Sequence, residues 1–152
     1  MSRQFQENYS LPNKLQYEEE GHPEIRFVVA DNTKLYQKGM AVTLSAAGEV
    51  DFATATDFVI GWVKTPNTPD NDLKNEVVIV TVFQDVVYGY AKTAGLTVGD
   101  LVTADGQSTV NGNFSDYIVA ATGQYASGIA LSTVAVTEQT AIGVLGTPVY
   151  KA

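Results

Sequence analysis

The same series of short motifs occurs twice along this chain of 152 residues, in the same order each time. Three pairs of segments match: residues 39–43 with 99–103, residues 58–63 with 125–130, and residues 80–88 with 142–150. The offset between the copies drifts from 60 residues to 67 and back to 62, so insertions would lie in loops. An ordered match of this kind predicts a duplicated unit of short β-strands. We therefore expect the function to lie in the surfaces of the protein and not in a pocket.

Alternating and β-branched segments, separated by turn residues, predict an all-β fold. The segments expected to form strands are residues 25–30, 40–44, 49–52, 58–63, 76–87, 107–110, 117–121 and 141–145. Asp105-Gly106 and Asn111-Gly112 predict two tight turns, and Pro148 indicates an edge strand. Residues 77–83 are nearly continuously apolar, which predicts a central strand. The architecture that fits is a sandwich or a partly closed barrel built from two duplicated β units.

The beginning of the chain differs in composition from the rest, because it is polar and interrupted by Pro12 and Pro23. We interpret residues 1–24 as an extended N-terminal arm and residues 25–152 as a β-domain, with the repeat at about 35–90 and 96–152. The arm carries isolated apolar anchors, namely Phe5, Tyr9, Leu11, Leu15 and Tyr17. A segment this polar does not bury enough surface to fold alone. We therefore expect the arm to be extended and paired with another chain.

The net charge of −8 excludes several partner classes. Phosphate neutralisation needs clustered Lys and Arg, so we expect no binding to nucleic acid or to an anionic membrane surface. The sequence contains no cysteine, which rules out disulfides and thiolate metal sites. The first residues lack the apolar core of a signal peptide, and no apolar run is long enough to span a bilayer. We expect a soluble protein made in a cytoplasm.

Residues that carry catalytic chemistry are scarce. His22 is the only histidine, and no nucleophile-elbow sequence G-x-S-x-G accompanies it. Asp70-Asn71-Asp72 offers oxygen atoms but lacks the glycine and the spacing of a calcium loop. We therefore predict no catalytic residue, no metal site and no cofactor, which means that the chain is not an enzyme.

The aromatic residues divide into an expected core residue and expected surface residues. Trp62 follows the apolar Val59-Ile60 pair and precedes Val63, so we expect it to be buried rather than stacked on a ligand. Tyrosine is enriched at protein interfaces because its ring is apolar while its hydroxyl stays wet. The tyrosines expected at an interface are Tyr88, Tyr90, Tyr117, Tyr125 and Tyr150.

The second copy of the repeat resembles a known family. Residues 96–102 (LTVGDLV) are similar to a strand entry of the form G-D-x-V, residues 127–131 (SGIAL) to a G-x-A segment, and residues 141–145 (AIGVL) to a closing strand. This pattern resembles the capsid cement, or head decoration, proteins of tailed bacteriophages, over roughly residues 35–152. In the first copy, Lys38-Gly39-Met40 lacks the aspartate of the pattern.

The resemblance implies a structural virion protein on the capsid surface, made in the host cytoplasm. Its partner would be the major capsid protein, between whose subunits it would bind, and it would form a homo-oligomer, often a trimer in this family. Two alternatives stay open. A head-fibre or fibre-base protein would use the arm as its capsid anchor, and a carbohydrate-binding module would use Trp62 or the tyrosines as stacking platforms.

Overall fold

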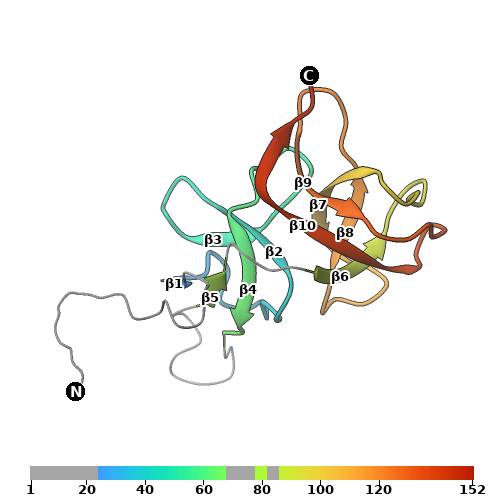
Figure 1. Cartoon of the computed structure of the whole chain (residues 1–152). Coiled ribbons are helices and arrows are strands. Elements are labelled where there is room, and N and C mark those ends of the chain that lie inside the picture. Colours follow the sequence, from blue (N-terminus) through green and yellow to red (C-terminus); the bar gives the residue numbers. More distant parts are fainter. Residues whose placement is uncertain (1–23, 68–77, 82–85) are drawn as a thin grey trace, which may run out of the picture.

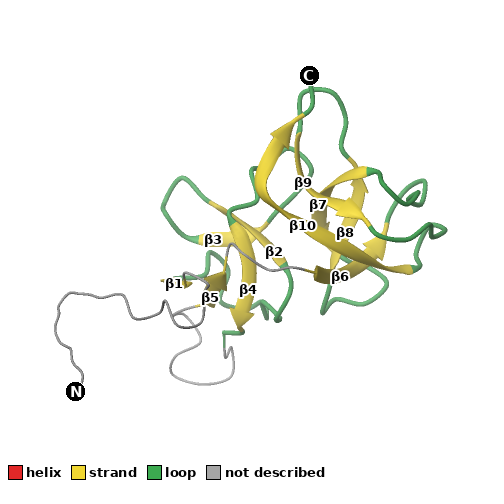
Figure 2. Ribbon diagram, viewed as in Figure 1, coloured by secondary structure: helices red, strands yellow, loops and turns green. Residues whose placement is uncertain are grey.

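The computed structural model describes residues 24–67, 78–81 and 86–152. These residues form ten β-strands and no helix, which confirms the all-β prediction (Figure 2). The strands are β1 (Glu24–Phe27), β2 (Ala41–Leu44), β3 (Val50–Phe52), β4 (Gly61–Thr65), β5 (Val78–Thr81), β6 (Val86–Ala91), β7 (Leu101–Gln107), β8 (Ser115–Val119), β9 (Tyr125–Ala130) and β10 (Gln139–Tyr150). No helix that could cross a membrane lies in this part of the chain.

The two halves of the chain have the same strand order. Strands β1 to β5, which we call the first unit, form a sheet in the order β1-β5-β4-β2-β3 (Figure 1). Strands β6 to β10, the second unit, form a closed barrel in the order β6-β10-β9-β7-β8. Each strand of the first unit therefore corresponds to the strand five positions later, which confirms the predicted duplication.

The strand registers agree with the offsets read from the sequence. Val42 pairs with Gly61 in the first unit, and Val102 pairs with Gly128 in the second. These residues are the ones aligned by the motif match, at offsets of 60 and 67 residues.

The match also holds for the predicted central strand. Val80 on β5 pairs with Val63, and Ile142 on β10 pairs with Ala130. Val80 and Ile142 therefore occupy corresponding strands, as the sequence predicted. Strand β5 lies between β1 and β4, so it is central.

The limits of the units differ from the predicted repeat limits. Strand β6 lies inside the first predicted repeat, yet it takes the place in the second unit that β1 takes in the first. Val87 pairs with Ile142 in the same way as Ile25 pairs with Val80. The match of Val87-Tyr88 with Val149-Tyr150 was therefore wrong, because short V-Y pairs contain too little information to locate a strand.

The units close to different degrees. In the second unit, β6 and β8 are parallel and pair at three positions, which closes the barrel. In the first unit, the corresponding contact is one parallel bridge between Val29 and Val50. The first unit is thus a partly closed version of the same barrel, because β3 has only three residues.

A tight turn opens the second strand of each unit. Gly39 and Gly99 adopt φ angles of 92° and 93°, a region that favours glycine. The two N–H groups donate to the carbonyl oxygens of Val63 and Ala130, each at 2.8 Å.

The missing aspartate of the first copy has a substitute. In the second unit, the Asp100 carboxylate accepts a hydrogen bond from the Thr97 backbone N–H at 2.8 Å. In the first unit, the Met40 sulfur accepts from the Gln37 N–H at 3.3 Å. The same turn can therefore form without the carboxylate.

Two local predictions in the second unit were wrong, and a third agrees with the strand pairing. Asp105-Gly106 lies inside β7, where the pairing with β8 shifts register, so it forms a bulge and not a tight turn. Residues 108–110 lie in a loop, so the strand expected at 107–110 is absent. Pro148 lies on β10 beyond residues 139–143, the part that pairs with β6, and at a register shift in the pairing with β9 between Val144 and Val149. One side of β10 is therefore unpaired at the proline, in agreement with the predicted edge position.

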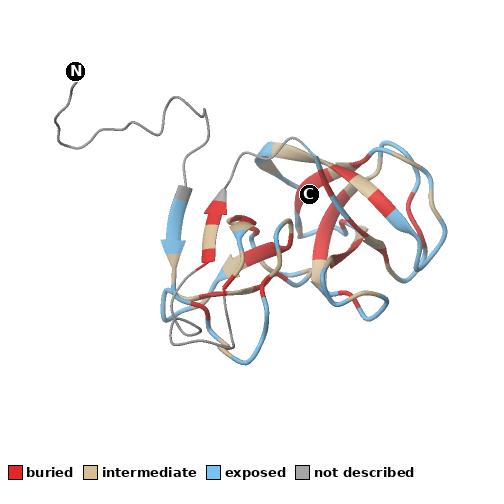
Figure 3. Cartoon of the chain, turned by 90° about the horizontal axis from the view of Figure 1, so that it is seen from below, coloured by how far each residue is buried: buried red, intermediate tan, exposed pale blue. Residues whose placement is uncertain are grey.

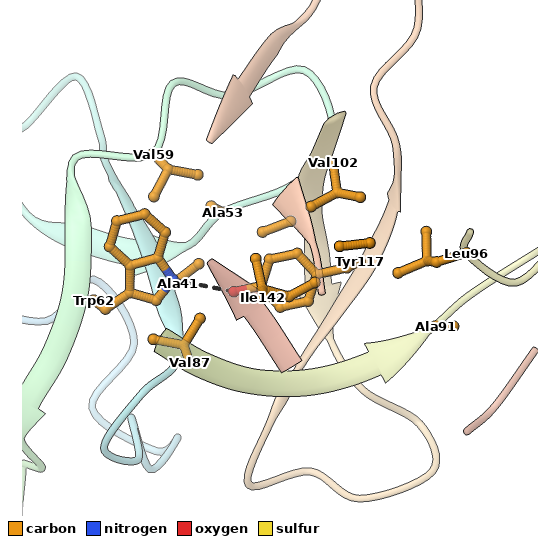
Figure 4. Close-up of a cluster of buried hydrophobic side chains, with 12 residues drawn as sticks. Ala41, Ala53, Val59, Trp62, Val87, Ala91, Leu96, Val102, Tyr117 and Ile142 are labelled. Carbon is orange, nitrogen blue, oxygen red and sulfur yellow. Dashed lines mark hydrogen bonds between the residues drawn. The ribbon is translucent and has the colours of Figure 1, made fainter. Parts of the chain in front are cut away.

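The core consists of two clusters of buried side chains. Figure 3 shows that buried residues lie on strands of both units. One lies within the first unit and includes Tyr36 and Met40. The other joins the two units and includes Trp62 from the first and Tyr117 from the second. The Trp62 Nε1–H donates to the Tyr117 hydroxyl at 3.0 Å (Figure 4). Trp62 is therefore buried, as predicted, and it lies between the units.

Candidate functional site

Three exposed aromatic side chains contact one another on the surface of the protein. Phe58, Tyr125 and Tyr150 are 48%, 42% and 55% exposed, and we call them the aromatic patch. The ring centroids of Phe58 and Tyr125 are 5.3 Å apart in an edge-to-face arrangement. Those of Tyr125 and Tyr150 are 5.1 Å apart and tilted by 59°. Grouped exposed aromatic rings of this kind are typical of interaction surfaces.

The repeat places two of the three rings. Phe58 and Tyr125 are corresponding residues, at the same offset of 67 that relates Gly61 to Gly128. Each follows a turn of four residues. In the first unit, the Thr54 N–H donates to the Asp57 carboxylate at 2.8 Å.

In the second unit, the Ala121 N–H donates to the Gln124 side-chain oxygen at 2.8 Å, in the same arrangement. The duplication therefore presents an aromatic residue at the same turn exit of each unit.

The C-terminal strand supplies the third ring. Tyr150 on β10 pairs directly with Tyr125 on β9. Beyond this pair, the Lys151 N–H donates to the Gln124 carbonyl, and the Gly123 N–H donates to the Lys151 carbonyl. These bonds hold the end of β10 beside the turn at 121–124, so the two tyrosine rings stay together.

Hydrogen bonds between the units position Phe58 beside Tyr125. The Gly106 N–H on β7 donates to the Ala53 carbonyl at 2.7 Å, and the Ala55 N–H donates to the Asp105 carboxylate at 3.2 Å. The loop that leads to Phe58 is therefore fixed to the second unit. The aromatic patch is preformed, so a ligand would not need to order it.

The predicted tyrosines separate into different environments. Tyr125 and Tyr150 belong to the patch. Tyr88 is 56% exposed on β6, and Tyr90 packs edge-to-face on Phe114 at 5.5 Å. Tyr117 was expected at an interface, and this was wrong, since it is fully buried. The Tyr117 side chain lies in the cluster between the units, so the first unit covers the face of β8 that carries it.

Several other predicted residues lie outside the described part of the chain. They are the arm anchors Phe5, Tyr9, Leu11, Leu15 and Tyr17, together with His22 and Asp70-Asn71-Asp72.

A polar cluster beside the barrel supports the fold. The Lys92 ammonium lies 2.8 Å from the Asp105 carboxylate, and this hydrogen bond raises the pKa of Lys92. Burial raises the pKa of Asp116, while a hydrogen bond from Ser108 and the charge of Lys92 oppose this shift. The Ser108 hydroxyl also accepts from the Val110 N–H at 3.1 Å, so it organises the loop after β7. Within residues 24–67, 78–81 and 86–152, no group of three or more acidic or histidine side chains could hold a metal ion.

The sequence reasoning missed Phe58 as a surface residue, because it lies in an apolar run that was expected to be a strand. The signal was nevertheless present, since the motif match aligns Phe58 with Tyr125. A tyrosine expected at the surface predicts that its partner in the other copy is also at the surface.

No protein-family model matches this chain, and no curated protein is similar to it.

Proposed function

We propose that this protein is a structural protein of a bacteriophage virion, which decorates the capsid by binding between major capsid subunits through the aromatic patch. The observation that carries the proposal is the patch itself, a preformed surface to which both units contribute. The sequence resemblance to capsid cement proteins names the partner. The proposal includes a location on the capsid surface, self-association of the free protein and the absence of an enzymatic activity.

The size of the patch indicates how it would bind. Three rings, each about half exposed, present roughly 300 Å² of apolar surface, which is similar to the largest patch on a typical monomer. A stable interface needs about 800 Å² on each partner. The patch would therefore form the centre of a larger contact, in which aromatic anchors contribute most of the binding free energy.

Decoration does not require a tight single contact. Many copies occupy equivalent sites on one shell, so modest contacts add up when one copy bridges two subunits. The negative net charge of the chain favours a partner surface with basic residues around an apolar recess.

Co-sedimentation with purified heads that lack the decoration protein tests the proposal. We expect wild-type protein to pellet with the heads, and the Tyr125→Ser/Tyr150→Ser variant to lose at least about tenfold in affinity, since anchor residues are worth 2 kcal/mol or more. The matched control is Tyr88→Ser, which removes a tyrosine of similar exposure outside the patch. Equal pelleting of both variants would contradict the proposal.

Glycan binding is a second candidate function, favoured by the exposed ring faces. Trp62 is not available as a platform because it is buried. Stacking of a sugar would therefore use Tyr125 or Tyr150, and would change the tyrosine fluorescence when oligosaccharides are added. A fluorescence response that Tyr125→Ser abolishes would favour this candidate over capsid binding.

A further inference from the structure

One edge of the first unit has no neighbour among the described strands. Strand β1 pairs with β5 along residues 24–27, and no described strand pairs with its other side over this range. Residues 89–91 of β6, which pair with β8, correspond to residues 27–29, so their counterpart in the first unit is the bridge between Val29 and Val50. Residues 24–26 lie before this contact, and their outer side is an unpaired edge among the described strands, to which another strand could add.

The open side carries the backbone groups of Arg26. Just beyond β1, the Val50 N–H donates to the Val28 carbonyl at 3.0 Å, and the Ala30 N–H donates to the Val50 carbonyl at 2.8 Å. Backbone groups of a strand point to alternate sides at successive residues. Since Val28 and Ala30 face β3, the N–H and C=O of Arg26 face the same, open side.

An apolar side chain is exposed beside this open edge. Ile25 and Val87 are corresponding residues, because they pair with Val80 and Ile142 respectively. Val87 is only 2% exposed because it packs in the cluster between the units, whereas Ile25 is 55% exposed and belongs to neither cluster. The unpaired edge of β1 therefore carries an exposed apolar side chain.

We infer that the open edge of β1 binds the N-terminal arm of a second copy of this chain. The arm has 23 residues before β1, and a fully extended chain of this length spans roughly 75–80 Å. A domain of this size has a radius of gyration of about 15 Å, so the arm can reach a neighbouring molecule. Leu15 and Tyr17 are two residues apart, which places both side chains on one face of a strand. On this face they would cover the exposed side chain of Ile25.

The charges favour the arm of a second copy over the chain's own arm. To pair with its own β1, the arm would have to reverse direction within residues 20–23. That hairpin would place Glu18, Glu19 or Glu20 opposite or next to Glu24, and like charges facing each other across a strand pair are unfavourable. A second copy is free of this restriction, because no short loop determines the register.

A proline substitution separates the edge from the rest of the sheet. Arg26→Pro removes the N–H on the open side and keeps the pairing with β5, because proline is tolerated where the N–H faces away from the ladder. Arg26→Ala is the matched control, since it removes the same side chain and keeps the N–H. We expect wild-type protein and Arg26→Ala to form the same oligomer in light scattering after size exclusion. Arg26→Pro should raise the Kd of the oligomer about tenfold or more, because it removes one backbone hydrogen bond and its ring blocks the approach of the arm.

A complementation experiment tests the direction of the contact. The double variant Leu15→Asp/Tyr17→Asp, which we call the donor variant, prevents the arm from binding to a neighbouring copy and leaves β1 unchanged. Each variant alone should be weakened, whereas a mixture with Arg26→Pro should form a heterodimer through one intact arm and one intact edge. Thermal unfolding followed by circular dichroism confirms that both variants are folded.

The inference is overturned if wild-type protein is a monomer at all concentrations, which would indicate an arm bound in cis or on another partner. It is also overturned if the donor variant keeps the wild-type oligomer. Neither result depends on capsid binding, so failure here is distinct from failure of the proposed function.

Discussion

Replacing Tyr117 by phenylalanine should weaken the contact between the two units without changing the shape of the core. The Tyr117 hydroxyl accepts a hydrogen bond from the Trp62 Nε1–H at 3.0 Å, and both side chains are buried in the cluster between the units. Phenylalanine keeps the ring and removes only the oxygen. The indole N–H would then be buried without its partner.

The expected loss is about 2 kcal/mol. A buried donor that loses its acceptor costs roughly 1–3 kcal/mol, because it cannot regain a hydrogen bond to water. For a protein of 152 residues, each kcal/mol shifts Tm by about 2–4 °C, so we expect a decrease of about 4–8 °C.

Fluorescence gives a direct assay, because Trp62 is the only tryptophan of the chain. Its emission follows the unfolding of the core between the units, and circular dichroism follows the whole fold. Tyr88→Phe is the control, since Tyr88 is exposed and its substitution should stay within about 0.5 kcal/mol of wild type.

A double-mutant cycle with Trp62→Phe isolates the pair from the loss of packing. We expect a coupling free energy of about 1 kcal/mol or more between the two substitutions. A coupling near zero, or an unchanged Tm for Tyr117→Phe, would show that the hydrogen bond does not stabilise the junction of the units.

Three further predictions concern stability. Gly89→Ala would place a Cβ 2.5 Å from the Tyr117 ring and 2.6 Å from a backbone oxygen. Urea denaturation should therefore show a decrease of at least about 1–3 kcal/mol in the free energy of unfolding. Gly146→Ala is the control and should be nearly neutral, because its Cβ would have no atom within 4 Å. The Thr103 hydroxyl is buried without a partner among the described residues, so Thr103→Val should raise the free energy of unfolding by about 1 kcal/mol in the same assay. Thr43→Val is the control and should bring no such gain, because it loses a hydrogen bond to the Phe58 carbonyl. Burial raises the pKa of Tyr117 to about 12, above the ordinary value of about 10. The stability that the neutral phenol contributes is therefore complete below about pH 10 and falls as the pH rises through 12. Tyr117→Phe should reduce this loss of stability at alkaline pH in melting curves.

Local patterns in the sequence determined the β-strands and their repeat. The period of two and the turn residues located most strands, and the motif match aligned Val42 with Val102 and Val80 with Ile142, as the registers show. This succeeded because strand propensity and side-chain alternation are local properties that a duplication preserves.

Only the tertiary structure decided what each face contacts. Alternation indicates that a strand has two faces, but it does not say whether a neighbour covers both, and so Tyr117 was placed on the surface although it is buried. The contact of Phe58 with Tyr125 joins corresponding residues of two units, and depends on how the units pack. The full closure of one barrel and the partial closure of the other follow from the length of β3 and from pairing between distant segments. Such pairing is set by the packing of the whole chain, because the free energy of a contact between distant segments depends on all the strands that bring them together.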